Sequence, residues 1–230
     1  MERDIKAVLF DMDGVLIDSR HLIEEIWTSV AAKYGIDLTA EFVRDHIHGR
    51  PGHYTRDRLF QAFSPEKRLA IKAEVDEMEE TAFSPMLPGL GAFIDRLKVH
   101  RIPAALVTSS WRQRITNVIE MHALQGFFTV VVDRNDVAHG KPDPQCYQLA
   151  AAQLGLAARE CLVFEDSVSG VQAGVASGAI CLGIGNSEAL VESGALARFG
   201  DFRSVDLCFV ESPEGSLTFS HDGTSFRLGM

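Results

Sequence analysis

Short apolar runs alternate with helical stretches along most of the chain. The runs are rich in large side chains, which is typical of strands buried on both faces of a sheet. The expected strands are residues 7–10, 102–108, 127–132, 160–165 and 179–185, and the expected helices are 89–100, 111–122, 144–155 and 168–178. This alternation predicts an α/β fold with a doubly wound, Rossmann-like parallel sheet and helices on both faces.

Residues 20–83 interrupt this alternation, because they read as consecutive helices without a convincing strand. The segment follows the first strand directly and closes with SPMLPG at 84–89, which is typical of a short linker. We therefore expect an all-helical cap domain, residues 19–85, inserted into an α/β catalytic core formed by residues 1–18 and 86–230.

The C-terminal segment 216–228 alternates apolar and polar residues on either side of Asp222-Gly223. An Asp-Gly pair between alternating segments is a strong signal for a β-hairpin. We expect this hairpin to be a structural appendage to the sheet.

Composition narrows the classes of partner. The chain has 230 residues, 46% of them hydrophobic, so it can bury a full core. Its formal net charge of −10 disfavours nucleic acid and anionic membranes as partners, so an anionic substrate must be held by local cations or by a metal. We expect a monomer or weak dimer.

Cysteine spacing and the N-terminus indicate the compartment. The four cysteines lie too far apart for a CxxC metal knuckle and fit no small disulfide framework, so reduced thiols are expected. The sequence has no signal peptide pattern and no apolar span of about 20 residues. These features predict a cytoplasmic protein.

Polar clusters follow four of the predicted strands. They are Asp11 with Asp13, Thr108 with Ser109, the HGKPDP segment that contains Lys141, and Glu165 with Asp166. Because ligands bind beyond the carboxyl ends of parallel strands, we expect these clusters to converge in one crevice. Several carboxylates invite a hard cation such as Mg²⁺, while hydroxyl, amide and ammonium groups suit phosphate oxygens. The combination predicts phosphoryl transfer.

The first two clusters have simpler interpretations. Asp11 and Asp13 could lie in a solvated loop, but an EF-hand is disfavoured because its fifth position would be Val15. Thr108 to Ser110 could instead cap a helix that begins at Trp111. Taken alone, the helix cap would be the better interpretation.

The other two clusters have alternatives as well. Lys141 could be an ordinary surface lysine in a turn. Glu165 and Asp166 could favour the positive end of the next helix, with Ser167 as its cap. The functional interpretation is favoured because all four clusters occur, in order, at strand ends.

Four segments, DMDGVLIDS, VTSS, GKPDP and FEDSVSG, carry a family resemblance. In this order they resemble the four motifs of the haloacid dehalogenase superfamily. A helical cap between the first two motifs is similar to its subgroup of small-molecule phosphatases and phosphomutases. The resemblance covers nearly the whole chain apart from the C-terminal hairpin.

The resemblance implies roles for individual residues. Asp11 would be the nucleophile that becomes an aspartyl phosphate, and Asp13 would protonate the leaving alcohol and then activate water. The resemblance further implies a metal and a phosphoryl site. Mg²⁺ would be held by Asp11, the backbone carbonyl of Asp13, Asp166 and, directly or behind these, Glu165, while the transferring phosphoryl group would be bound by Thr108, Ser109 and Lys141.

The sequence also bears on the choice of reaction. Asp13 disfavours a dehalogenase, which needs no proton for a leaving alcohol. β-Phosphoglucomutase-like members carry a histidine five residues beyond the aspartate that corresponds to Asp18, and here that position is Ile23, while His21 lies two residues too early. A phosphatase is therefore favoured over a phosphomutase, and a non-catalytic binding protein on the same fold is a third alternative.

The cap segment 46–58 is rich in histidine and arginine. Its IHGRP motif is similar to bacterial phosphatases of hexose, deoxyhexose and polyol phosphates, so Arg50 and His53 are candidate substrate contacts. A solvated cap face is an equal alternative. A zinc site is less favoured, because no acidic or cysteine ligand lies beside the histidines except Asp45 and Asp57. We expect hydrolysis of a sugar or sugar-alcohol phosphate.

Overall fold

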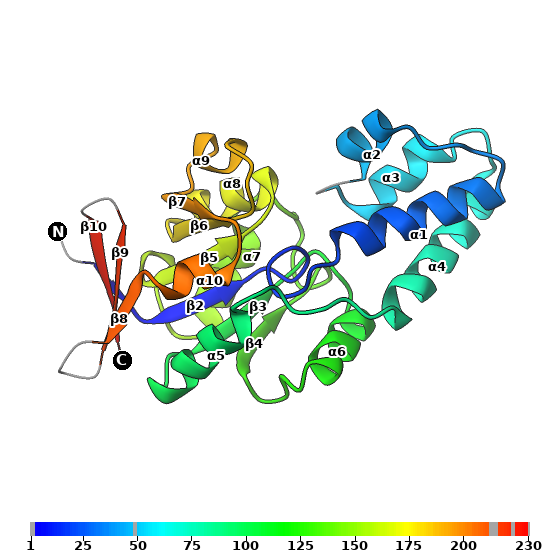
Figure 1. The fold of residues 1–230 in the computed structure, drawn as a ribbon. Helices are drawn as coiled ribbons and strands as arrows, with labels where there is room; N and C mark the ends of the chain where they lie inside the picture. The colour runs from blue at the N-terminus through cyan, green and yellow to red at the C-terminus, as the bar shows by residue number, and fades with distance from the viewer. Residues whose placement is uncertain (1–2, 48–49, 212–215, 222–223, 230) are drawn as a thin grey trace.

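The structure is a computed structural model that describes residues 3–47, 50–211, 216–221 and 224–229. Its centre is a six-stranded parallel sheet of order β4-β3-β2-β5-β6-β7 (Figure 1). The strands are β2 (Ala7–Phe10), β3 (Ala104–Val107), β4 (Phe128–Val132), β5 (Cys161–Glu165), β6 (Ile180–Ile184) and β7 (Ala197–Phe199). Counted along the chain, this is the 3-2-1-4-5-6 order of a doubly wound sheet. The predicted Rossmann-like core is confirmed.

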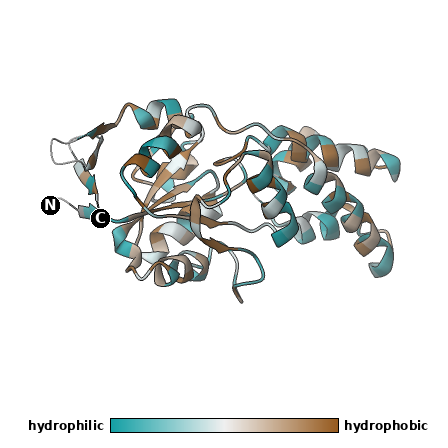
Figure 2. Ribbon diagram, turned by 90° about the horizontal axis from the view of Figure 1, so that it is seen from below, coloured by the Kyte–Doolittle hydropathy of each residue, from teal (hydrophilic) through white to brown (hydrophobic). Residues whose placement is uncertain are grey.

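Helices cover both faces of this sheet. All four residues of β2 are buried and alternate between two hydrophobic clusters, Val8 and Phe10 on one face and Ala7 and Leu9 on the other. The first cluster includes residues of α5 (Leu90–Val99), α6 (Arg112–Met121) and α10 (Phe202–Asp206), and the second includes residues of α7 (Gln145–Gln153), α8 (Val168–Ser177) and α9 (Ala189–Glu192). Figure 2 shows the mostly hydrophobic strands between these helices.

Four helices form a second lobe beside the sheet (Figure 1). They are α1 (Arg20–Lys33), α2 (Ala40–His46), α3 (Gly52–Leu59) and α4 (Pro65–Thr81). Trp27, Phe60 and Ile71 belong to a hydrophobic cluster of this lobe alone. The side chains of Thr39 and Ser64 accept hydrogen bonds from the first turns of α2 and α4, so the sequence itself sets where these helices begin. We call residues 19–85 the cap and the remainder the core.

The predicted hairpin is present, but it does not extend the parallel sheet. It belongs to a second, four-stranded sheet, whose strands in spatial order are β1 (Arg3–Ile5), β10 (Thr224–Leu228), β9 (Leu217–His221) and β8 (Phe209–Glu211). The turn residues Asp222 and Gly223 lie outside the described residues. The hairpin attaches to the core through Phe219 and Phe226, which belong to the same hydrophobic cluster as Val8 and Phe10, while β10 pairs with β1 and not with the parallel sheet.

Several short elements were not predicted. They are β1, β7, β8, α9 and α10, each of three to five residues. A helical or strand period needs a longer window to become visible in a sequence. In the described ranges, no helix is long and apolar enough to cross a membrane.

Candidate active site

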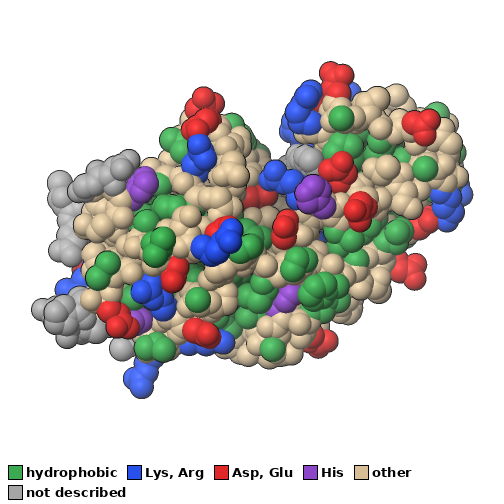
Figure 3. Space-filling model, viewed as in Figure 1, with side chains coloured by type: hydrophobic (Ala, Val, Ile, Leu, Met, Phe, Trp, Pro, Cys, Tyr) green, Lys and Arg blue, Asp and Glu red, His purple; other side chains and the backbone are tan. Residues whose placement is uncertain are grey.

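The cavity that holds the predicted chemistry lies between the core and the cap, where Figure 3 shows the surface indented between the two lobes. Its volume is about 190 Å³. Its floor is the carboxyl edge of the sheet at β2 and β5, where the strand order changes direction. Asp11 follows β2, Thr108 follows β3, Asp166 follows β5, and Lys141 lies in the loop after β4. The structure thus brings all four predicted clusters to one place.

Lys141 joins two carboxylates at the base of this cavity. Its Nζ donates to Asp11 Oδ1 and Glu165 Oε1, both at 2.7 Å, and to the carbonyl oxygen of Val107 at 3.1 Å. Burial alone would lower the pKa of Lys141, but the charges of Asp11 and Glu165 outweigh it and raise the pKa above its ordinary value. Lys141 is therefore a fixed positive charge beside Asp11.

Three carboxylates face one another around Asp11. Oxygens of Asp11, Glu165 and Asp166 lie within 4.8 Å of one another. Burial, with the neighbouring negative charges, raises the pKa of Asp11 well above its ordinary range and that of Asp166 to about 7, against the opposing effects of Lys141 and Arg20. The cluster thus carries negative charge that the protein does not fully balance, and its oxygen donors fit a hard divalent cation.

Glu165 differs from the other two carboxylates because hydrogen bonds occupy both of its oxygens. Oε1 accepts from Lys141 and from the hydroxyl of Tyr147 at 2.7 Å, while Oε2 accepts from the backbone N–H of Asp166 at 3.1 Å and from Ser167. Glu165 is fully buried and is not among the described residues that line the cavity. It lies behind Lys141 and fixes the direction of the ammonium group.

Two glycines allow this dense packing of charge. A Cβ atom on Gly14, whose φ is +75°, would lie 2.0 Å from Asp166 Oδ2. A Cβ atom on Gly170 would lie 1.9 Å from the carboxylate of Glu165. Any other residue at either position would displace an acidic side chain of the site.

Asp13 has a different set of partners from Asp11. Both of its oxygens receive hydrogen bonds from Arg114 at 2.6 Å, and Oδ1 also accepts from the hydroxyl of Ser19 at 2.5 Å. Burial would raise the pKa of Asp13, but the charge and hydrogen bonds of Arg114, together with Ser19, lower it. The two aspartates thus lie in opposite environments, although only Met12 separates them in the chain.

The hydroxyl segment after β3 does not cap the next helix. α6 begins at Arg112, its cap residue is Trp111, and no side chain makes the cap hydrogen bond. Thr108 is buried and its hydroxyl accepts from the N–H of Ser110 at 3.1 Å, whereas Ser109 is exposed and lines the cavity. The segment forms a tight turn, and Thr108, Ser109 and Ser110 line the cavity.

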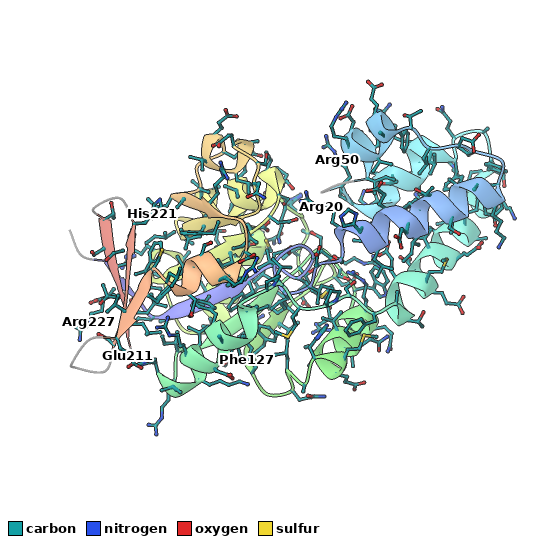
Figure 4. All side chains as sticks on the ribbon, viewed as in Figure 1. Arg20, Arg50, Phe127, Glu211, His221 and Arg227 are labelled. Carbon is teal, nitrogen blue, oxygen red and sulfur yellow. The ribbon has the colours of Figure 1, made fainter. Side chains whose placement is uncertain are left out.

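The cap supplies the opposite wall, and the two predicted cap residues differ in position. Arg50 lines the cavity on the side of the cap that faces the core (Figure 4). His53 is exposed and is not among the described residues that line it. Ile23, where a histidine was expected for a phosphomutase, lines the cavity.

Sequence reasoning missed Arg114 and Glu79, which also line the cavity. Arg114 is 3% exposed and lies on the buried face of α6 with Ile115 and Val118. A charged residue on the apolar face of a predicted helix was the available signal. Glu79 lies on α4, and burial raises its pKa to about 7, although the charges of Arg114 and Lys72 oppose this.

The class of protein follows from the fold and the site together. A doubly wound core with two aspartates after its first central strand and an inserted helical cap is typical of phosphatases. The profile of the haloacid dehalogenase-like hydrolases matches residues 5–178. The chain belongs to this family, so the resemblance carried by the four motifs is confirmed.

Curated relatives agree with this assignment. The chain is 34% identical to the phosphorylated carbohydrates phosphatase of Thermotoga maritima, over 84% of this chain and 93% of the relative. It is 37% identical to hexitol phosphatase A of Escherichia coli, over 75% of this chain and 80% of that one. Among solved structures, a haloacid dehalogenase (HAD) family hydrolase of Deinococcus radiodurans with bound phosphate and sodium is 28% identical to this chain. The two structures superpose with a TM-score of 0.70 over 86% of this chain and 92% of the other. The prediction of a phosphatase is confirmed by this family and these relatives.

Proposed function

We propose that the protein hydrolyses a small sugar or sugar-alcohol phosphate in a Mg²⁺-dependent reaction through a phosphoenzyme formed on Asp11. The observation that carries this proposal is the contact between Asp11 Oδ1 and Lys141 Nζ at 2.7 Å, beside a second acidic group, Asp166. One oxygen of Asp11 is fixed by the lysine, which leaves the other to attack phosphorus. The ammonium charge and backbone N–H groups near Ser109 oppose the charge of an incoming phosphoryl group.

In the first proposed step, the carboxylate of Asp11 forms a bond to phosphorus and the bond to the alcohol oxygen breaks. Asp13 enters this step in its protonated form, which its lowered pKa makes the minor form in the free protein, and gives that proton to the departing oxygen. In the second step, Asp13 takes a proton from water, which attacks phosphorus and releases inorganic phosphate and free Asp11. Thr108 orders the turn that presents Ser109, and Lys141 stays paired with Glu165 throughout.

The described carboxylates fit a magnesium site. Asp11, the backbone carbonyl of Asp13 and Asp166 would hold the ion, and Glu165 would act through its contacts to Lys141 and to the N–H of Asp166. A bound Mg²⁺ would neutralise charge on the phosphoryl oxygens and on the acidic cluster. The raised pKa values of Asp11 and Asp166 support the need for such a cation.

The cavity favours a small polar ester. Its volume of about 190 Å³ lies below the range of roughly 300 Å³ and upward that is usual for drug-sized ligands. Arg50 and the ring of Trp111 line it, and such groups suit sugar hydroxyls and an apolar sugar face. Two of the named relatives act on phosphorylated carbohydrates or hexitols. Ile23 offers no proton-transfer group at the cavity wall, which favours hydrolysis over a phosphomutase reaction.

A panel of phosphate esters assayed for phosphate release, with Mg²⁺ or with EDTA, tests the proposal. We expect hexose and hexitol phosphates to be the best substrates and EDTA to abolish turnover. Asp11→Asn should lower kcat by at least about 10³-fold, because it removes the nucleophile. Asp95→Asn, an exposed change on α5, is the matched control and should leave kcat unchanged. An active Asp11→Asn variant would exclude the phosphoenzyme, and a wild type inactive on all esters would favour a non-catalytic binding protein.

A further inference from the structure

Arg114 is a buried arginine in the active-site cavity to which the mechanism above gives no task. Its Nη1 and Nη2 donate to Oδ2 and Oδ1 of Asp13, both at 2.6 Å, and Nη1 also lies 3.2 Å from the hydroxyl of Ser110. Its guanidinium carbon lies 5.8 Å from the ring centroid of Trp111. A planar guanidinium in two-point contact fixes both the position and the plane of the carboxylate that it binds.

The remaining nitrogen of Arg114 faces the cap. Its Nε is buried and, among the described residues, has no hydrogen-bond partner. On the cap side, Oε2 of Glu79 on α4 lies 4.0 Å from this nitrogen. A buried N–H without a partner is costly, so the cap carboxylate lies where a small shift of α4 would complete the contact. Arg114 is therefore shared between an aspartate of the core and a glutamate of the cap.

The end of α4 is attached to α6, which carries Arg114. Trp111 donates through its indole N–H to the carboxylate of Glu80, and the side-chain amide of Asn117 donates to the carbonyl oxygen of Glu80 at 2.8 Å. These contacts hold residue 79 next to Arg114 and tie the cap to the helix that orients Asp13. A displacement of α4 would therefore be transmitted to the guanidinium.

We infer that Arg114 is a positioning residue for the acid/base Asp13, and that Glu79 of the cap helps to place Arg114. The inference rests on the proposed function, because it needs Asp13 to transfer a proton to the leaving group. In this role Arg114 acts through Asp13. It holds the carboxylate in the plane and direction from which it meets the leaving oxygen, and Glu79 restrains the guanidinium from the cap side.

The dependence of the reaction on its leaving group separates this role from a general one. The ratio kcat/KM covers the steps up to formation of the phosphoenzyme, where the leaving oxygen of a sugar phosphate needs a proton. The leaving group of p-nitrophenyl phosphate is a weak base and does not need one. Arg114→Gln should lower kcat/KM for the best sugar phosphate by about 10²-fold but for p-nitrophenyl phosphate by less than about 5-fold, since misplacing a general acid affects poor leaving groups most. For the sugar phosphate, the kcat/KM of Arg114→Lys should lie between the values for Arg114→Gln and the wild type.

A second measurement tests whether Arg114 acts through Asp13. In an Asp13→Asn background, adding Arg114→Gln should change kcat/KM for the sugar phosphate by less than about twofold, because residues that act as one unit are not additive. The matched control is Arg112→Gln, since Arg112 lies on the same helix, is half exposed and is not among the described residues that line the cavity. This control should keep the wild-type ratio between the two substrates.

Arg114→Gln removes the partner of the half-buried carboxylate of Asp13, so the folded fraction of each variant is measured by thermal unfolding and the rates are corrected for it. Glu79→Gln is the smaller change, and it should lower kcat/KM for the sugar phosphate by about 3- to 10-fold with the same preference for p-nitrophenyl phosphate. Equal losses on both substrates, or a full multiplicative loss in the Asp13→Asn background, would overturn the inference while leaving the phosphatase intact. A wild type that hydrolyses neither ester would overturn the proposed function and the inference with it.

Discussion

The two walls of the active-site cavity are built on different principles. On the core wall, the side chain of Lys141 is 7% exposed and bonds to two carboxylates and a strand carbonyl. On the cap wall, Arg50 is exposed, its Nε donates to the carbonyl oxygen of Asp45 at 3.2 Å, and its guanidinium lies 5.5 Å from the ring centroid of Tyr54. The sheet supplies the close placement that bond making requires, whereas the cap offers side chains that can adapt to different esters.

The largest loss of activity is expected from Gly170→Ala, which adds a methyl group behind the core wall. Gly170→Ala would put a Cβ atom 1.9 Å from the carboxylate of Glu165, which hydrogen bonds fix on all sides. Because Glu165 directs Lys141 at Asp11, we expect kcat to fall by about 10²-fold or more and the protein to lose about 1–3 kcal/mol of stability. Steady-state kinetics and urea unfolding measure the two effects.

Gly91→Ala is the matched control for that change. Gly91 lies on α5 with no atom within 4 Å of a Cβ placed on it. The variant should keep full activity and gain about 0.5–1 kcal/mol, because alanine is the better helix former. If Gly170→Ala behaved like Gly91→Ala, the packing of Glu165 would not determine the geometry of the core wall.

Glu79 lies where the cap wall meets the core wall, and it should make the free energy of unfolding depend on pH. Burial raises the pKa of Glu79 to about 7 in the folded protein, above the ordinary value of 4.5. Between these two values the folded state binds the proton more tightly than the unfolded state does, so wild-type stability from this group is present at low pH and is lost as pH rises to 7. Glu79→Gln does not titrate there, so its stability relative to the wild type should rise by up to about 3 kcal/mol between pH 5 and pH 8.

Urea unfolding of both proteins in EDTA at several pH values measures this difference. Glu77→Gln, an exposed change on the same helix, is the control, and its difference from the wild type should stay flat with pH. A flat difference for Glu79→Gln as well would mean that Glu79 keeps its charge in the folded protein and is fully paired with Arg114. A difference that rises with pH would instead mean that the buried charge of Glu79 destabilises the folded protein at neutral pH.

The contrast between the walls also explains which parts of the site could be predicted from the sequence. Asp11, Lys141 and Asp166 follow strands of a parallel sheet, and one geometric rule brings such positions together whatever the details of packing. The alternating strands and helices and the helical cap follow from periodicity in the same way. The core wall could therefore be predicted from local patterns.

Contacts that depend on how separate elements meet could not be predicted. Arg114 and Glu79 lie on helices that no sequence period places side by side, and their roles appear only once α4 lies against α6. The hairpin was visible as an alternation, but its partner β1 is a strand of three residues more than 200 positions away in the chain. His53 and Arg50 share one basic segment, yet only Arg50 reaches the cavity among the described residues.

That last pair gives the smallest expected effect and the most direct test of the cap wall. If Arg50 contributes a hydrogen bond to the sugar in the ground state and the transition state alike, Arg50→Gln should raise KM about 5-fold with little change in kcat. This increase corresponds to a loss of about 1 kcal/mol of binding free energy. His53→Gln should change KM by less than about twofold, since an exposed side chain outside the cavity makes no such contact. The two changes lie three residues apart, so a general disturbance of the cap would affect both alike. Equal KM effects would show that the cap wall shifts when substrate binds, and a large fall in kcat for Arg50→Gln would mean that the cap takes part in the chemistry assigned to the sheet.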